Sequence, residues 1–339
     1  RRQGGLTQEA NTLFPIANNQ SPYHIDLNTW RVDGFVKNGY VFDADLGTSI
    51  GIIASASYHN QQNTYGPRQW NAAQTNAYLN AIFQTTFDDS NSDLWDDHQN
   101  KVSAGLSVNY DGYEESLGDE ATRLLGDEVM RHEVTTGVFV EYTYTYKDKL
   151  TLLAGIREDY SSRYGFFTTP RMNVRYAPFE WWTLRASVGL GYRSPNAIAD
   201  NAAYLPSNRI YHFNADSLAQ ERSMNTGIST VFYIPIGKKE LQISGEYYYT
   251  KFLDGVIADM DRSLHGITLY NMHDVDGAKY FSHNWQVEAT MEILRGWTMT
   301  AAFRYTDVKQ TTFNTVANEY QLRDKPLQNK FKGIITTSY

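Results

Sequence analysis

The feature that most constrains this chain is a strict alternation of apolar and polar residues, which recurs in long segments. The clearest segment runs from Glu133 to Tyr146. Its apolar positions are Val134, Val138, Val140, Tyr142, Tyr144 and Tyr146, and its polar or small positions are Glu133, Thr135, Gly137, Glu141, Thr143 and Thr145. A two-residue period places successive side chains on opposite faces of a β-strand. The segment therefore predicts a strand with one apolar and one polar face.

The same pattern returns along the chain from Trp30 to Tyr339. Apolar residues share a face at Trp30, Val32, Val36, Tyr40 and Phe42, at Ile50, Ile52, Ala54, Ala56 and Tyr58, at Leu150, Leu152, Ala154 and Ile156, and at Trp182, Leu184, Ala186, Val188, Leu190 and Tyr192. About thirteen such strands fit, near the length of roughly 9 to 11 residues that a tilted transmembrane strand needs. A soluble sandwich buries its apolar faces and a membrane barrel turns them to lipid, so alternation alone leaves both open.

The connections between the predicted strands favour the barrel, because short and long connections alternate in order. Short turns are predicted at 43–46, 147–149, 178–181, 237–239 and 294–296. Long polar links are predicted at about 59–74, 111–132, 161–169, 194–221, 253–266 and 306–328. Outer-membrane barrels have short periplasmic turns and long external loops, whereas a sandwich has no reason to sort its loops by end.

Composition fits a membrane barrel and excludes several other classes of protein. No run of about 18 to 20 apolar residues occurs, so helical membrane spans are excluded. The mean hydropathy of -0.52 and the aromatic fraction of 14% are compatible with strands that have only one apolar face. Cysteine is absent, which removes disulfides and thiolate metal sites, and the net charge of -8 disfavours a nucleic-acid partner.

Aromatic residues gather near the ends of the predicted strands. Tyr144, Tyr146, Trp181, Trp182 and Trp297 lie beside short turns, and Tyr160, Tyr192, Tyr247 and Tyr249 lie towards the long links. Such positions are typical of the aromatic belts at the two membrane interfaces. The alternative is that aromatic residues simply favour strands.

Between Gly137 and Ser229 the sequence resembles the barrel of TonB-dependent outer-membrane receptors. The resemblance is carried by LLAGIREDY (152–160), TTPRMNVRYAP (168–178), TLRASVGLGYRSPN (183–196) and NADSLAQERSMNTGIS (214–229), in the order in which the family's motifs occur. The hairpin GVFVEYTYTYKDKLTLLAGIREDY (137–160) is also similar to one that is frequent in these barrels.

The resemblance implies an all-β fold in which residues 1–339 are part of a transmembrane antiparallel β-barrel of about 22 strands. An N-terminal plug and some strands would lie outside this sequence, whose start, Arg1 to Gly5, looks like the middle of a loop. The implied function is import of a scarce nutrient, such as siderophore-bound iron, cobalamin or haem, across the outer membrane of a Gram-negative cell. The implied partners are the nutrient, the lipid bilayer and, through the plug, the TonB complex. A passive porin-like channel and a soluble β-rich lectin or carbohydrate-active enzyme are the alternatives.

Two sets of candidate site residues follow. The external links contain Tyr65, Arg68, Trp70, Tyr204, Arg209, Tyr211 and His212, which could bind a ligand by hydrogen bonds, stacking and cation–π contact. In haem-importing members of the family a histidine in the region of His212 is an iron ligand, whereas the simpler alternative is a solvated loop histidine. The polar strand face contains Glu141, Arg157, Arg185 and Arg193, which we expect to line the lumen and contact the plug.

Neither a catalytic site nor a site for a metal ion or cofactor is predicted. The string Gly47-Thr48-Ser49-Ile50-Gly51 matches the G-x-S-x-G pattern of serine hydrolases, but it lies in an alternating strand and not at a sharp strand-to-helix turn. His132-Glu133 begins like a zinc-protease motif and lacks the second histidine. The chain is therefore not expected to be an enzyme.

Overall fold

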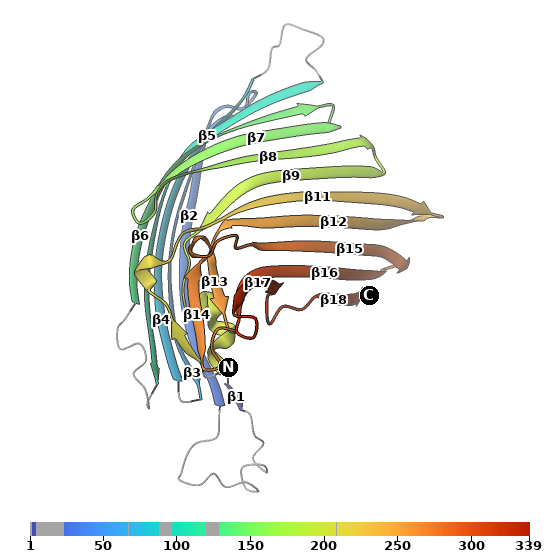
Figure 1. Cartoon of the computed structure of the whole chain (residues 1–339). Helices are drawn as coiled ribbons and strands as arrows, with labels where there is room; N and C mark the ends of the chain where they lie inside the picture. Colours follow the sequence, from blue (N-terminus) through green and yellow to red (C-terminus); the bar gives the residue numbers. More distant parts are fainter. Residues whose placement is uncertain (1, 5–23, 67, 88–96, 120–128, 208) are drawn as a thin grey trace.

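Most of the chain forms one long antiparallel β-sheet, which bends around a hollow (Figure 1). The structure is a computed structural model that describes residues 2–4, 24–66, 68–87, 97–119, 129–207 and 209–339. The sheet has fifteen strands. They are β1 (Arg2–Gly4), β2 (His24–Asp43), β3 (Thr48–Tyr65), β4 (Arg68–Phe87), β5 (His98–Asp119), β6 (Val129–Tyr146), β7 (Leu150–Ser161), β8 (Gly165–Phe179), β9 (Trp182–Arg193), β11 (Glu221–Ile236), β12 (Lys239–Asp254), β15 (Tyr280–Leu294), β16 (Trp297–Asn314), β17 (Glu319–Asp324) and β18 (Phe331–Ser338).

The two edges of this sheet do not meet within the described part of the chain. β17 and β18 both pair with β16, along different parts of its length, and so occupy one position. At the other edge β1 pairs with β2, so the expectation that the chain starts in the middle of a loop is wrong for Arg2–Gly4. The all-β antiparallel architecture is confirmed, as an open barrel wall. No helix among the described residues is long and apolar enough to cross a membrane.

One end of the sheet, the turn end, carries the short connections. Residues 44–47, 147–149, 180–181, 237–238 and 295–296 join successive strands there, which confirms the five predicted short turns. In the β6–β7 turn φ is positive at Lys147 (47°) and Asp148 (53°), and the Lys149 N–H donates to the Tyr146 carbonyl oxygen (2.9 Å). Positive φ at both central residues is the type I′ geometry, whose twist matches that of paired strands.

The opposite end, the loop end, has shorter connections than the sequence predicts. β3 ends at Tyr65 and β4 begins at Arg68, so the long link expected at about 59–74 is wrong. β7 ends at Ser161 and β8 begins at Gly165, so the link expected at 161–169 is wrong as well.

Strand extension also changes two other predicted links. In the link expected at 111–132, β5 continues to Asp119 and β6 begins at Val129, and residues 120–128 lie outside the described residues. β16 continues to Asn314, well into the link expected at 306–328. In both segments, polar residues on the two faces of the chain led to the prediction of a loop. A strand that has left the apolar layer needs no apolar face, because backbone pairing alone satisfies its N–H and C=O groups.

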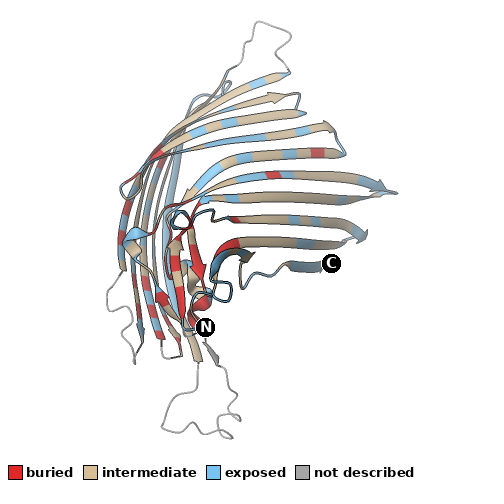
Figure 2. Cartoon of the chain, in the orientation of Figure 1, coloured by how far each residue is buried: buried red, intermediate tan, exposed pale blue. Residues whose placement is uncertain are grey.

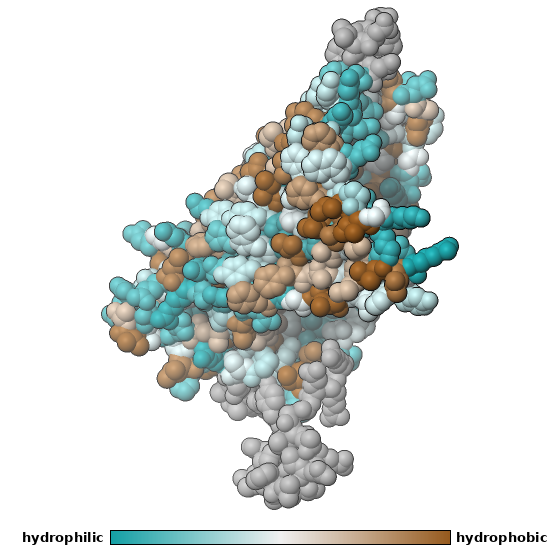
Figure 3. Space-filling view, turned by 90° about the vertical axis from the view of Figure 1, so that its right-hand side faces the viewer, coloured by the Kyte–Doolittle hydropathy of each residue, from teal (hydrophilic) through white to brown (hydrophobic). Residues whose placement is uncertain are grey.

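The register of pairing sorts the strand side chains onto two faces. The inner face, towards the hollow, contains a row formed by Thr151, Arg175, Arg185, Ser229, Glu246, Gln286 and Arg304. The outer face exposes large apolar side chains, among them Leu106, Val138, Ile156, Met172, Val188, Ile228, Trp285 and Phe303. Figure 3, which looks at the right-hand side of Figure 1, shows a group of apolar side chains right of the centre and a mixture of apolar and hydrophilic ones elsewhere. An apolar outer face and a polar inner face are the arrangement of a membrane barrel.

Aromatic rings pack together on the outer face near the turn end. Trp182 and Phe232 stack with ring centroids 6.3 Å apart, and Trp181 stacks on Phe179 at 5.3 Å. Further along this end, the His98 ring lies 4.7 Å from the Tyr146 ring. Aromatic residues are enriched at membrane interfaces. The rings near the turn end thus lie where the aromatic belt of a membrane barrel is expected.

Two segments at the loop end fold back into the hollow. Residues 194–220 contain the 3-10 helices η1 (Ala199–Ser207) and η2 (Ala215–Ser217) and the strand β10 (Ile210–His212). Residues 255–279 contain β13 (Val256–Asp259), β14 (Gly266–Asn271) and η3 (Met272–Asp274), so the link expected at 253–266 is longer and partly strand. β10 pairs in parallel with β14, which pairs with β13. Buried residues are concentrated around this small sheet (Figure 2).

Candidate functional site

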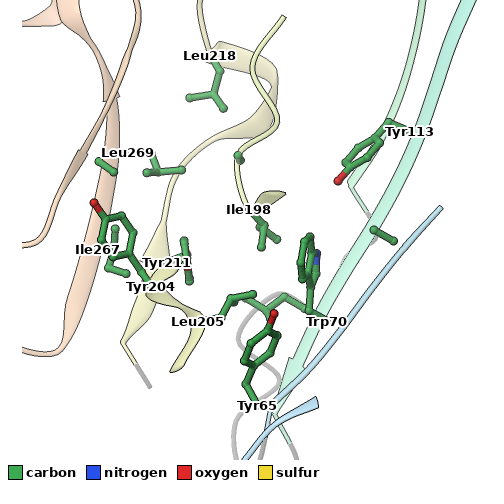
Figure 4. Packing of buried hydrophobic residues seen from close by; sticks show 14 residues of the cluster. Tyr65, Trp70, Tyr113, Ile198, Tyr204, Leu205, Tyr211, Leu218, Ile267 and Leu269 are labelled. Carbon is green, nitrogen blue, oxygen red and sulfur yellow. The ribbon is translucent and has the colours of Figure 1, made fainter. Parts of the chain in front are cut away.

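The first feature of the inner face is an apolar cluster at the loop end, where the inward segments pack on β3, β4 and β5 (Figure 4). Ile198 and Leu205 of the 194–220 segment are fully buried there, and so is Ile267 of β14. Burying such a side chain stabilises the folded form by about 1.5 to 3 kcal/mol. This cluster therefore fixes the inward segments to the barrel wall.

Four of the predicted ligand contacts belong to this cluster. Tyr65, Trp70, Tyr204 and Tyr211 each expose 9% or less of their surface. Tyr65 and Trp70 lie on strands and not in the loop that the sequence predicts. Their burial gives them a packing role, because little of each ring is left for a ligand to touch. A direct ligand contact by any of them stays a prediction.

The two predicted arginine contacts join the wall to the inward segments. Arg68 of β4 is buried, and its Nη1 donates to the Arg209 carbonyl oxygen at 2.6 Å. Arg209 Nη1 in turn donates to the Met260 carbonyl oxygen at 2.7 Å. The two side chains thus connect β4, the 194–220 segment and the end of β13. Carbonyl acceptors at a strand end are available because no ladder partner uses them.

His212 is the exposed member of the predicted set. It ends β10, and its imidazole lies against Gly266, where an added Cβ would come within 2.9 Å of the ring. The described residues contain no group of three or more His, Asp or Glu side chains that could hold a metal ion. His212 is thus a single exposed imidazole, and its contact with a ligand stays a prediction.

Sequence reasoning missed a buried carboxylate, that of Glu115, which lies beside Trp70 and Tyr113 of the apolar cluster. Glu115 Oε1 accepts hydrogen bonds from Trp70 Nε1 (3.1 Å) and the Tyr113 hydroxyl (3.3 Å), and the Ala199 backbone also bonds to this carboxylate. Burial raises the pKa of Glu115 from 4.5 to about 7, against the opposing effect of these hydrogen bonds. A titratable group near neutral pH thus holds the start of η1. The only sequence signal is an acidic residue on the same strand face as Tyr113 and Leu117.

A second missed group fixes the first residues of the inward segment. Arg131 of β6 forms an ion pair with Asp111, and its Nη1 donates to the Pro195 carbonyl oxygen at 3.1 Å. Gln74 Nε2 donates to the other Asp111 oxygen at 2.7 Å. The ion pair orients the Arg131 guanidinium, and its hydrogen bond to the carbonyl oxygen holds Pro195 at the wall.

The residues predicted to line the lumen share the inner face by register. Glu141 lies opposite Gly155, Gly155 opposite Arg171, and Glu141 and Arg171 form an ion pair. Arg157 binds Asp159 with two hydrogen bonds (2.7 and 2.6 Å) and donates to Ser107 Oγ at 2.6 Å.

The other two lumen candidates differ in their partners. Arg193 Nη1 donates to Asp200 of η1 at 2.6 Å, and its Nε donates to Glu221 at 2.8 Å. Arg185 lies opposite Arg175 and is exposed. The pairing places all four predicted residues on the polar wall, and contact with a plug stays a prediction.

Comparison with known proteins then gives a family. The family pattern that matches residues 2–339 is described as TonB dependent receptor-like, beta-barrel. No curated protein matches the chain in sequence.

Solved structures with the same fold include outer-membrane receptors of low sequence identity. The alcaligin outer-membrane receptor FauA from Bordetella pertussis has a TM-score of 0.59 at 13% identity, over 93% of this chain and 51% of that one. The hemophore receptor HasR from Serratia marcescens, solved with its hemophore HasA and heme, has a TM-score of 0.62 at 12% identity, over 96% and 55%. The ferric citrate transporter FecA has a TM-score of 0.58 at 11% identity, over 99% and 50%. The chain thus spans about half the length of each.

Proposed function

The chain belongs to the TonB-dependent receptor β-barrel family, and we propose that it is the barrel wall of a receptor that imports a scarce nutrient with energy from TonB. The observation that carries the proposal is the polar, charged inner face with two chain segments fixed on it at the loop end. Such a wall suits a lumen that holds other protein and a ligand. We propose no covalent chemistry for it.

The membrane location follows from the family. TonB-dependent receptors are barrels of the Gram-negative outer membrane, and the outer face of this chain exposes the apolar side chains that lipid requires. The short turns then lie on the periplasmic side and the inward segments on the external side. A ligand from outside would meet 194–220 and 255–279 first.

The relatives narrow the class of ligand that we propose. FecA is a ferric citrate transporter, HasR was solved with heme, and PirA from Pseudomonas aeruginosa is a siderophore receptor. We therefore propose an iron-carrying ligand, a siderophore complex or haem, in preference to cobalamin. Among the candidate contacts, His212 is the most accessible, since it is exposed in the hollow. Imidazole is a ligand that haem iron accepts.

The proposal is tested by uptake of radiolabelled iron, supplied as single siderophore complexes or as haem. The strains are the wild type, a deletion of the full-length receptor gene, the deletion complemented in trans, and a strain without TonB. Energised import predicts saturable uptake that is lost without the receptor and without TonB. Uptake that needs the receptor but persists without TonB would identify a passive channel and overturn the proposal.

A matched pair of variants tests the ligand contact. His212→Ala should raise the concentration for half-maximal uptake, while His265→Ala, which removes an exposed histidine from the neighbouring segment, should leave it unchanged. Equal uptake curves for the two variants would remove His212 from the site.

A further inference from the structure

Two arginines face each other near the turn end of the inner face. Arg175 on β8 and Arg185 on β9 are direct cross-strand partners, which is an unfavourable arrangement for like charges. Arg175 Nη1 donates to the Asp148 carbonyl oxygen at 2.7 Å, a bond that leaves its charge in place. Within the described residues, neither guanidinium has a carboxylate within 4.0 Å.

Arg304 on the same face donates to Gln286 and forms no ion pair within the described residues. Four other arginines on this wall each form an ion pair with an acidic residue in the same part of the barrel. These pairs are Arg131–Asp111, Arg157–Asp159, Arg171–Glu141 and Arg193–Glu221. Glu246 is in the same row as Arg185 but two strands away, with Ser229 between them. Glu141 and Arg171 form an ion pair across the same two-strand separation, but within the described residues no ion pair joins Glu246 to Arg185 or Arg175. Two adjacent positive charges are therefore left without an internal anion.

A cavity of about 270 Å³ opens beside this pair. Polar side chains around it are Thr151, Asn173, Ser187 and Ser229, which can donate hydrogen bonds. Tyr248 forms part of the cavity wall and packs on Gly227. A Cβ atom added at Gly227 would lie 2.3 Å from the Tyr248 ring. The site is thus a pocket with two guanidinium groups and neutral donors, and no negative charge among its lining residues.

We propose that Arg175 and Arg185 form an oxyanion-binding site on the inner wall, which takes a carboxylate or phosphate group. Guanidinium groups bind such oxyanions through paired hydrogen bonds, and an anion between them cancels their mutual repulsion. The anion has two possible sources. It is either an acidic side chain of protein that fills the barrel or an anionic solute in the lumen. Both arginines belong to the barrel wall, so the site does not require that the protein imports a nutrient, and it goes beyond the proposed import.

The test measures thermal unfolding of the full-length receptor in detergent. Inorganic phosphate is titrated against sodium chloride at matched ionic strength, for the wild type, Arg185→Gln and Arg185→Lys. Arg171→Gln is the control, because it removes an arginine from the same wall that Glu141 already neutralises. Arg185→Lys keeps the charge and remains informative if Arg185→Gln does not fold.

Two results support the site and separate its sources. For a solute site, phosphate raises the unfolding temperature of the wild type and of Arg171→Gln by about 1 °C at ten times its Kd, and by more at higher phosphate. Arg185→Gln then shows no rise, and Arg185→Lys shows a smaller one. For an internal carboxylate, phosphate does not change the unfolding temperature of the wild type. Arg185→Gln then unfolds at a lower temperature than the wild type, and the unfolding temperature of Arg185→Lys is closer to that of the wild type.

Two other results overturn the site. In the first, phosphate does not change the unfolding temperature of the wild type, and Arg185→Gln unfolds at the same or a higher temperature. Removing the repulsion between the two arginines would then be the only effect of the substitution. The second is a phosphate response that is equal in the wild type and Arg185→Gln. Neither depends on iron uptake, so a failed import proposal and a failed anion site are distinguishable.

Discussion

The indole Nε1 of Trp70 on β4 donates a 3.1 Å hydrogen bond to the Glu115 carboxylate on β5, and this carboxylate also bonds to the Ala199 backbone of η1. One buried carboxylate therefore connects two strands of the barrel wall to the segment that folds into the hollow. Because burial raises its pKa from 4.5 to about 7, the attachment should depend on pH.

The first prediction concerns this pH dependence. Between pH 4.5 and about 7 the folded form holds a proton on Glu115 that the detached form releases, so attachment weakens as pH rises through this range. Glu115→Gln stays neutral and should remove the dependence. The measurement is hydrogen exchange of the 197–205 amides in the full-length receptor from pH 5 to 8, corrected for intrinsic exchange. Glu114→Gln, an exposed neighbour on the opposite face, is the control and should behave as the wild type. A Glu115→Gln profile with the wild-type slope would exclude Glu115 as the titrating group.

The second prediction concerns the apolar cluster. Leu205 is fully buried among residues of the wall and of β14. Leu205→Ala should destabilise the docked segment by about 2 to 5 kcal/mol, because the removed methyl groups leave a cavity. Limited proteolysis of the full-length receptor should then cut within 194–220 faster than in the wild type. The control, Leu264→Ala, changes a leucine that is 84% exposed and should not alter cleavage there. Equal cleavage in both variants would mean that other contacts hold the segment.

The third prediction concerns Gly137 on β6. An added Cβ at this position would lie 1.9 Å from Asp159 Oδ1 and 2.5 Å from Arg157 Nη2, so the ion pair lies directly over the glycine. Gly137→Ala should cost about 1 to 3 kcal/mol, since the pair must shift or break. The readout is the unfolding temperature of the purified receptor. Gly34→Ala on β2, where nothing lies within 4 Å of an added Cβ, should leave that temperature unchanged. A tolerated Gly137→Ala would show that the pair can move without loss.

The fourth prediction compares the two faces of β5. Leu106 is 62% exposed on the outer face, and Ser103 lies on the inner face opposite Glu141. Leu106→Arg should destabilise the barrel in lipid by about 2 to 4 kcal/mol, because a charge would enter the bilayer core. Ser103→Arg should be tolerated, because it faces the lumen beside a carboxylate. Folding of the full-length receptor into lipid vesicles measures both. The reverse order of stability would mean that the two faces have been exchanged.

The sequence predicted much of this wall for a physical reason. The alternation from Val134 to Tyr146 predicts one strand with two faces, and β6 covers that range. The turn at Lys147 to Lys149 is also correct, because few residues separate two clear strands there. The pattern failed at 59–74, where polar residues continue β3 and β4 beyond the apolar layer. Beyond that layer hydrophobic periodicity carries no information on where a strand ends.

The sequence by itself determined the two-faced strands, the short turns and the family, because periodicity and turn chemistry are properties of neighbouring residues. Tertiary structure decided which polar side chains meet. Trp70 and Glu115 are 45 residues apart, and Arg175 faces Arg185 only because of the register between β8 and β9. A shift of that register by one residue would turn a side chain to the other face. The buried carboxylate and the paired arginines therefore depend on strand pairing, which no local pattern in the chain specifies.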